Sequence, residues 1–245
     1  MAKKTPVLIA KDLSFVYEIK ALRNNKTRWT KLKSVVIGHK KQIKAIQDIS
    51  LTLNSGEIIA LVGNAGSGKS TLLENLSGGL RPTSGEIWAS EQPVLLNGSF
   101  AFFGQLSGAD NINLALLAMG KTKTEANELT KEIIESAKLK KIANHPLSSY
   151  PSTIRKKIVF EIAFAQNPKI LLIDQRVKLR GQAEKEEFER RLKTIAKSGS
   201  CIVLVGMPLA QVSKLCNRMV WLDHGQVKED GTVKRLVPIF KARKS

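Results

Sequence analysis

The sequence has few cysteines, few acidic residues and no long apolar run, and each shortage narrows what the chain can be. Cys201 and Cys216 are its only cysteines, and both lie in apolar surroundings without metal-ligand spacing. This excludes a disulfide framework and is typical of small core residues in a reducing cytosol. No apolar run approaches the ~20 residues of a membrane span, and residues 7–10 are too short for a signal peptide. We therefore expect a cytosolic chain, or one held at a membrane only through a partner.

The shortage of acidic residues leaves the chain strongly basic. It has 21 Asp and Glu against 40 Lys and Arg, a formal net charge of +19. Such a charge attracts nucleic acid, an anionic lipid leaflet or a phosphate-rich substrate, and it does not choose among them. Its densest part is a basic insertion at about residues 18–44, with no acidic residue between Lys20 and Lys44. Two interpretations stay open: contact with lipid headgroups or an anionic polymer, or a solvated surface loop.

The strongest motif is a glycine-rich loop that fits G-x-x-x-x-G-K-[ST] at every fixed position. A strand-like apolar run over 57–62 precedes it and a helix-like run over 69–76 follows it, as the motif requires. Glycines let backbone N–H groups close on phosphates, and the helix N-terminus adds partial positive charge. A strand-to-helix turn that binds nothing is the alternative. The predicted nucleotide-binding residues of this loop are Gly63, Asn64, Ala65, Gly66, Ser67, Gly68, Lys69, Ser70 and Thr71.

Three side chains supply the chemistry predicted for this site. Lys69 would reach the β- and γ-phosphate oxygens, and the Ser70 hydroxyl would be a magnesium ligand. The apolar run before Asp174 predicts a buried strand with a carboxylate at its C-terminal end, where parallel α/β sheets bind ligands. This matches the Walker B pattern and predicts Asp174 as the second magnesium anchor. The alternative is an aspartate that only caps the next segment.

The remaining pattern predicts a single α/β domain with an insertion. Strands are predicted at 7–17 and 45–53, around the basic insertion, and a hairpin turns at His224 and Gly225. Apolar residues recur at helical spacing in much of the range from about 106 to 166, which predicts an inserted helical subdomain. We expect one nucleotide-binding domain over residues 1–245.

With these motifs in this order, the chain resembles the ATP-binding subunit of an ABC transporter, closest to the teichoic acid and polysaccharide export type. The segments that carry the likeness are 63–70, 106–112 (similar to that group's L-T-G-x-x-N-I), 170–174 and 217–225. The resemblance implies an α/β P-loop NTPase fold of ABC type, with a mostly parallel core sheet, an antiparallel β subdomain and an inserted α-helical subdomain. It implies ATP and Mg²⁺ as cofactors and Gln105 near the metal. It also implies that Tyr17 stacks on adenine, a core aromatic being the alternative.

The departures from the family fall on residues that perform hydrolysis. The signature, usually L-S-G-G-Q or Y-S-S-G-M, reads here Tyr150, Pro151, Ser152, Thr153 and Ile154, with a basic run at 176–180 in place of the D-loop. Gln175 occupies the base position and cannot accept a proton. Met207, an apolar thioether, occupies the histidine switch position. Losing a base costs about 10²–10⁴ in rate and losing one transition-state donor about 10²–10³. We expect ATP binding with weak intrinsic hydrolysis.

The resemblance implies a subunit at the cytoplasmic face of the cell membrane that couples ATP binding and slow hydrolysis to a separate ABC permease. It would act as a homodimer or as a heterodimer with an intact ATPase subunit. The alternative is a hydrolysis-deficient regulatory or scaffold subunit that pairs with an active paralogue. No nucleic-acid partner is expected, because ABC-type proteins of that kind usually carry two nucleotide domains or long coiled coils. A small-molecule kinase is disfavoured because no arginine-rich lid segment is evident.

Overall fold

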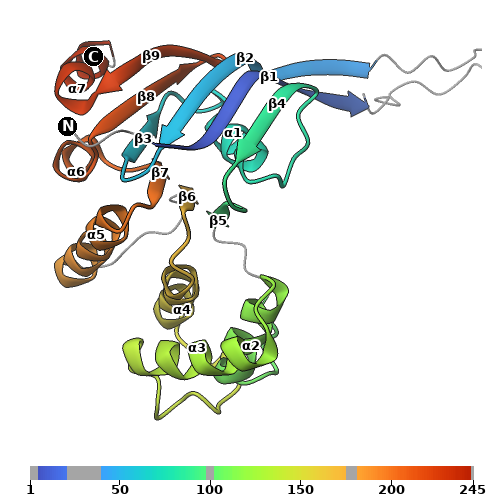
Figure 1. Cartoon of the computed structure of the whole chain (residues 1–245), viewed down its shortest axis with the longest axis vertical. Helices are drawn as coiled ribbons and strands as arrows, with labels where there is room; N and C mark the ends of the chain where they lie inside the picture. The colour runs from blue at the N-terminus through green and yellow to red at the C-terminus, as the bar shows by residue number, and fades with distance from the viewer. Residues whose placement is uncertain (1–4, 21–39, 98–101, 175–180, 244–245) are drawn as a thin grey trace, which may run out of the picture.

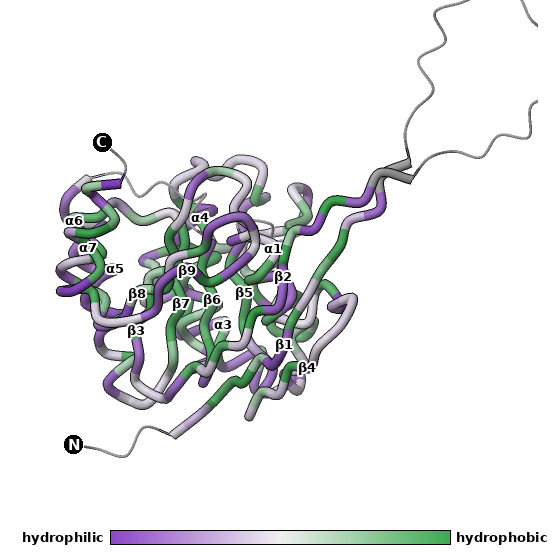
Figure 2. The backbone as a smooth tube through the Cα atoms, turned by 90° about the horizontal axis from the view of Figure 1, so that it is seen from above, coloured by the Kyte–Doolittle hydropathy of each residue, from purple (hydrophilic) through white to green (hydrophobic). Residues whose placement is uncertain are grey.

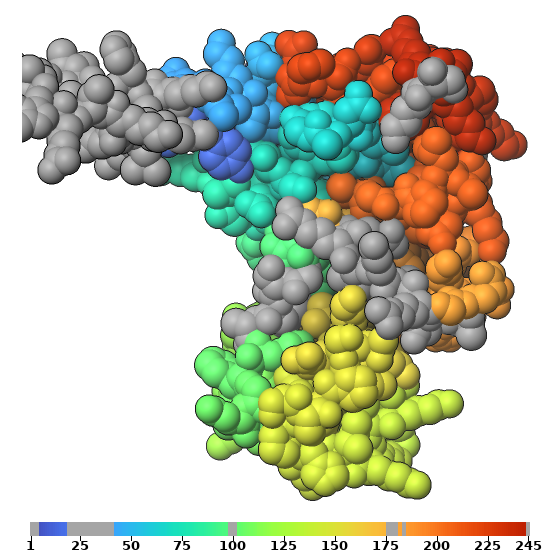
Figure 3. Space-filling view, turned by 180° about the vertical axis from the view of Figure 1, so that it is seen from behind, coloured from blue at the N-terminus to red at the C-terminus, as the bar shows by residue number. Residues whose placement is uncertain are grey.

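The computed structural model describes residues 5–20, 40–97, 102–174 and 181–243. Two sheets with their helices form a body at one end, and a group of helices forms a lobe at the other (Figure 1). The space-filling view shows this lobe projecting below the body (Figure 3). Most of the basic insertion, Gln175 and the basic run 176–180 lie outside the described residues.

An antiparallel sheet covers one side of the body. In the described part of the chain it has three strands in the order β2-β1-β4. Along β1, Leu8, Ala10 and Leu13 are buried whereas Ile9 is exposed, so the inner face of the sheet is apolar. β1 pairs with β2 along its whole length, and only part of β1 pairs with β4. The strands are β1 (Pro6–Lys20), β2 (Lys40–Asn54) and β4 (Ser84–Ala89).

The second sheet forms the centre of the body. Its described strands run in the order β5-β6-β7-β3-β8-β9, all parallel to their neighbours except the β8–β9 hairpin. The residues of β6 and β7 are all buried, which explains their unbroken apolar sequence. The hydropathy view shows green, hydrophobic strands at the middle of the body (Figure 2). The strands are β3 (Ile58–Val62), β5 (Val94–Leu96), β6 (Ile170–Asp174), β7 (Cys201–Val205), β8 (Arg218–Asp223) and β9 (Gln226–Thr232).

Helices pack on both faces of the central sheet. α1 (Lys69–Leu76) buries its leucines in a core shared by both sheets. α5 (Gln182–Lys197), α6 (Leu209–Leu215) and α7 (Val233–Ala242) cover the other face. Cys201 lies in the core with α1, and Cys216 lies in the core on the other face. Burial raises the pKa of each thiol to about 12. Within the described ranges, no helix combines the length and the apolar content that a membrane crossing requires.

The lobe consists of α2 (Gly108–Ala118), α3 (Lys123–Ser136), the 3₁₀ helix η1 (Leu147–Ser149) and α4 (Ser152–Ala165). α4 belongs to two cores at once. Ile158 and Ile162 pack inside the lobe, whereas Phe160 and Phe164 pack against Phe188 of the body. The α/β fold predicted from the sequence is confirmed. The division into subdomains at about 106–166 stays a prediction.

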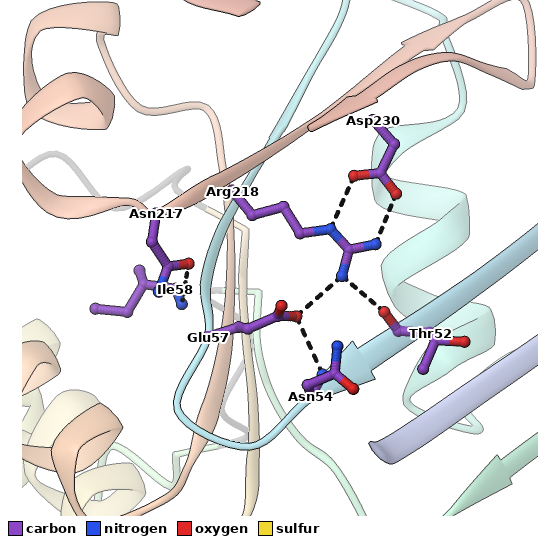
Figure 4. A network of polar contacts seen from close by, with 7 residues as sticks. All are labelled: Thr52, Asn54, Glu57, Ile58, Asn217, Arg218 and Asp230. Atoms are coloured by element: carbon purple, nitrogen blue, oxygen red, sulfur yellow. Dashed lines mark hydrogen bonds and ion pairs between the residues drawn. The ribbon is translucent and has the colours of Figure 1, made fainter. Parts of the chain in front are cut away.

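A network of charged side chains holds the start of β3 between the two sheets (Figure 4). The Arg218 guanidinium donates to Asp230 at 2.6 and 2.8 Å, to Glu57 at 2.9 Å and to the carbonyl of Thr52 at 2.8 Å. The hydrogen bond to Asp230 is the main cause of a raised pKa at Arg218. Glu57 is buried, and its carboxylate also accepts the N–H of Asn54 at 3.1 Å. The network therefore fixes the strand that leads into the glycine-rich loop.

Candidate nucleotide site

The glycine-rich loop joins the carboxyl end of β3 to the first turn of α1, as predicted. The loop packs directly against the backbone of β8 and of β2. A Cβ on Gly63 would lie 2.3 Å from the carbonyl oxygen of Leu222, and one on Gly68 would lie 2.4 Å from that of Ala45. Gly68 also has a φ of 96°, in the left-handed region. Glycine at these two positions therefore allows backbone to meet backbone, which shapes the loop.

The Lys69 side chain folds back over this loop. Its ammonium donates to the carbonyl of Gly63 at 3.1 Å, the carbonyl of Asn64 at 2.6 Å and the hydroxyl of Ser67 at 3.0 Å. Phosphate oxygens can take the place of these three acceptors, because the ammonium has three N–H donors and binds phosphate as a point charge. The structure thus places Lys69 at the loop, and its phosphate role stays a prediction.

Ser70 and Asp174 come together at this edge of the sheet. The Ser70 hydroxyl, in the first turn of α1, donates to Asp174 Oδ2 at 2.7 Å, and Asp174 is buried at the end of β6. A hydroxyl and a carboxylate are hard oxygen ligands of the kind that Mg²⁺ takes, together with substrate phosphates and water. The described residues hold no cluster of three or more His, Cys, Asp or Glu for a metal ion. The chemistry of the Ser70–Asp174 pair fits a magnesium ion, and the metal role of the pair stays a prediction.

Gln105 lies in the turn that leads into α2. It is exposed, and the backbone of this turn pairs with η1: the N–H groups of Leu147 and Ser148 donate to Leu106 and Gly104 at 2.9 Å. These hydrogen bonds attach the turn to the lobe. Its role as a metal ligand stays a prediction.

Tyr17 stands beside the first turn of α1. Tyr17 is 39% exposed, and its hydroxyl lies 3.3 Å from the Thr71 hydroxyl. Phe15 packs against the ring edge-to-face at 4.8 Å, and Ile43 is its partner across β2. Tyr17 is therefore not a fully buried core residue, and an exposed ring face next to the loop suits stacking on a base. That role also stays a prediction.

The signature segment lies in the lobe. Tyr150 is buried: its hydroxyl donates to the carbonyl of Ile142, and burial raises its pKa. Pro151 caps α4, whose first turn contains Ser152, Thr153 and Ile154. A proline before the first turn suits a helix start, since the first helical N–H groups have no intrahelical partner. The segment is thus a helix N-terminus, with backbone N–H groups at its end.

Gln175 and Met207 occupy the two positions at which the sequence predicts weakened hydrolysis. Gln175 lies outside the described residues, directly after Asp174. Met207 follows β7, whose last residue, Val205, pairs with Asp174. The Met207 thioether is half-buried against the core of the body. It offers no N–H or O–H donor to a phosphate.

Asn111 has a role that the sequence analysis did not assign. It is 2% exposed, and its side chain bonds the N–H and the carbonyl of Phe103 at 2.7 and 2.9 Å and the carbonyl of Ser107 at 2.9 Å. These bonds hold the turn that contains Gln105 against α2. The available signal was an asparagine among apolar helix positions, because a buried polar side chain needs internal partners.

The chain is similar to proteins of known families. The family model for ABC transporters matches residues 46–177. The teichoic acids export ATP-binding protein TagH of Staphylococcus saprophyticus is 34% identical over 226 residues, which are 91% of this chain and 84% of that protein. Its counterpart in Listeria monocytogenes is 34% identical over 192 residues, which are 78% of this chain and 57% of that protein.

Solved structures show the same fold. A structure described as the ATP-binding subunit of an ABC transporter has a TM-score of 0.75 at 20% identity, and the match covers 98% of this chain and 95% of the other. A dimeric ATP-binding cassette in a post-hydrolysis state has a TM-score of 0.70 at 20% identity, covering 92% and 98%. The fold inferred from the resemblance is confirmed by these likenesses.

Proposed function

Because this chain belongs to the ABC transporter family, we propose that it is the ATP-binding subunit of an exporter for teichoic acid or a related cell-surface polysaccharide. The observation that carries the ATP site is the approach of Ser70 to Asp174 beside the loop that Lys69 covers. The cargo rests on the names of the relatives, and a net charge of +19 is compatible with an anionic polymer.

The described residues can be assigned roles in nucleotide binding. The loop amides and Lys69 bind the phosphates, and the Ser70 hydroxyl and the Asp174 carboxylate hold Mg²⁺. When bound, the ion neutralises negative charge on the β- and γ-phosphate oxygens. Tyr17 stacks on the adenine from the β1 side. Each of these assignments rests on position and on the chemistry of the side chain.

Hydrolysis by this chain alone is proposed to be slow. Gln175 can orient a water molecule and cannot take its proton. Met207 supplies no hydrogen bond to the γ-phosphate. Thr153 replaces the signature glycine where a backbone would approach the nucleotide of an opposite subunit. Binding is therefore retained in this proposal while turnover is weak.

The proposed partners are a membrane permease and a second ATP-binding subunit. A cassette of this fold has been solved as a dimer, which supports dimerisation here. In a heterodimer with an intact paralogue, the nucleotide of the paralogue would face residues 150–154 of this chain. We place the complex at the cytoplasmic face of the membrane, where the basic insertion would meet anionic headgroups.

A regulatory subunit is the second candidate function. Met207 favours it, because an apolar side chain at the end of β7 leaves the switch position without a donor. In this role, ATP binding would hold the dimer together while the paralogue performs hydrolysis.

The first experiment compares ATP affinity and magnesium-dependent turnover of the wild type with Lys69→Ala and Gln175→Glu. We expect tight binding that Lys69→Ala abolishes, wild-type turnover at least about 10²-fold below that of an intact ABC ATPase, and a gain in Gln175→Glu. Lys193→Ala, at an exposed lysine on α5, is the matched control. Absence of ATP binding would overturn the proposed site, and ordinary wild-type turnover would overturn the proposed weak hydrolysis.

A further inference from the structure

The glycine-rich loop rests on the turn between β8 and β9. The N–H of Gly225 in this turn donates to the carbonyl of Ser67 at 3.2 Å. A Cβ on Gly225 would lie 2.7 Å from the carbonyl oxygen of Ala45 on β2. Loop, turn and β2 therefore meet closely through their backbones. A shift of the turn would be passed directly to the loop.

Gln47 of β2 holds this turn through two hydrogen bonds. Its backbone N–H donates to the carbonyl of Gly225 at 2.8 Å, and its side-chain Nε2 donates to the carbonyl of His224 at 2.8 Å. His224 and Gly225 have φ angles of 47° and 79°, the left-handed pair that a two-residue hairpin turn requires. Two consecutive carbonyls thus face β2, and one half-buried residue binds both.

The opposite side of the turn is held by Asp223. Its carboxylate accepts Lys228 Nζ at 2.9 Å and lies 3.0 Å from His224 Nδ1, and the hydrogen bond from Lys228 is the main cause of its lowered pKa. These contacts stay within the hairpin. Gln47 instead connects the hairpin to the antiparallel sheet. Its side chain therefore affects the position of the whole turn relative to β2.

We propose that Gln47 is a positioning residue for nucleotide binding. The contacts run from Gln47 to His224 and Gly225, from Gly225 to Ser67, and from the Ser67 hydroxyl to Lys69 at 3.0 Å. By fixing the turn, Gln47 keeps the loop in one shape before phosphate arrives, which lowers the ordering cost of binding. This inference rests on the proposed ATP site and adds a residue far from it in the sequence.

The test replaces Gln47 by methionine, which has similar length and no donor. We expect Gln47→Met to bind ATP about 3- to 10-fold more weakly, the range covered by one net hydrogen bond. Inorganic tripolyphosphate should lose affinity by the same factor, because the loop holds phosphates and not the base. Gln226→Met, at an exposed glutamine next to the same turn, is the matched control and should bind as the wild type does.

A purely structural role for Gln47 predicts a different result. The affinities are measured by calorimetry at a temperature where circular dichroism shows all variants folded. A structural residue would then lower the melting temperature and leave both affinities unchanged, which would overturn the proposal. Gln47→Lys keeps a donor and should recover affinity beyond the gain of Gln226→Lys, which controls for added charge. A wild type that binds neither ligand would instead refute the proposed ATP site.

Discussion

Tyr17 and Ile43 face each other across β1 and β2, and their side chains are 39% and 42% exposed. If the Tyr17 ring stacks on adenine, Tyr17→Ala should weaken ATP binding by about 5- to 150-fold, the range of one stacked base. Tyr17→Phe keeps the ring and loses only the contact to Thr71, so it should bind nearly as the wild type does. Calorimetry with ATP and with tripolyphosphate measures both effects. An equal loss for tripolyphosphate in Tyr17→Ala would contradict stacking.

Single residues of the site differed in how far the sequence could predict them. Lys69 and Ser70 follow from a motif with fixed spacing, and Asp174 follows from the apolar strand before it. Gln47 could not be predicted, because its partner His224 lies 177 positions away and offers a backbone carbonyl that carries no sequence signal. The exposure of Tyr17 also needed the structure, since alternate residues of a strand face opposite ways.

The first turn of α3 shows how an element depends on its cap. The Thr122 hydroxyl accepts the N–H of Glu125 at 3.3 Å, and the Glu125 carboxylate accepts the N–H and hydroxyl of Thr122 at 2.8 and 2.7 Å. The hydrogen bond from the Thr122 hydroxyl is the main cause that holds the pKa of Glu125 below its usual range. Thr122→Ala removes half of this capping box and should lower the free energy of unfolding by about 0.5–2 kcal/mol.

The same cap predicts a pH dependence. Because the pKa of Glu125 is lowered by folding, its contribution is present above the unfolded pKa and is lost as pH falls through the folded pKa. The stability difference between the wild type and Glu125→Ala should therefore be largest at neutral pH and shrink in acid. Thermal unfolding at a series of pH values measures it. A stability difference that grows in acid would contradict the prediction.

Short or end-lying elements were the ones that the sequence analysis missed. β5 has only three residues, and its strand character comes from pairing with β6. α7 carries a proline, Pro238, inside the helix, and its apolar face is completed by Trp221 of β8. β1 and β2 each run to 15 residues because they pair with each other beyond the apolar part. Contacts with other elements therefore determine whether such segments form strands or helices and how far these extend.

At the scale of the whole molecule, the Arg218 network joins the two sheets. Arg218→Met removes the ion pair between Arg218 and the buried Glu57 carboxylate, so we expect a loss of about 2–4 kcal/mol in the free energy of unfolding. Arg235→Met, which breaks an exposed pair with Glu229, should cost less than about 1 kcal/mol. Urea unfolding of both variants gives the comparison. Equal losses would contradict the importance assigned to burial of the Arg218 network.

The α/β class was predictable from the whole chain because strands, helices and motifs alternate in one order. The attachment of the lobe was not. The second half of α4 is apolar all round except for Glu161, so its sequence does not show that Ile158 and Ile162 face one core while Phe160 and Phe164 face another. A buried ion pair adds to this attachment, since Arg191 of α5 contacts Glu161 of α4.

α4, which belongs to the cores of both the lobe and the body, also connects two parts of the proposed nucleotide sites. α4 starts at Ser152, directly after its N-cap Pro151, and the chain then passes through Pro168 into β6, whose last residue is Asp174. One helix, one turn and one strand thus connect the segment proposed to face the nucleotide of a second subunit with the carboxylate proposed to hold the metal of this one. A shift at either end of this stretch of chain would change the position of the other end. In the proposed dimer, a displacement of α4 at the nucleotide of the second subunit would therefore move Asp174 at the nucleotide of this one.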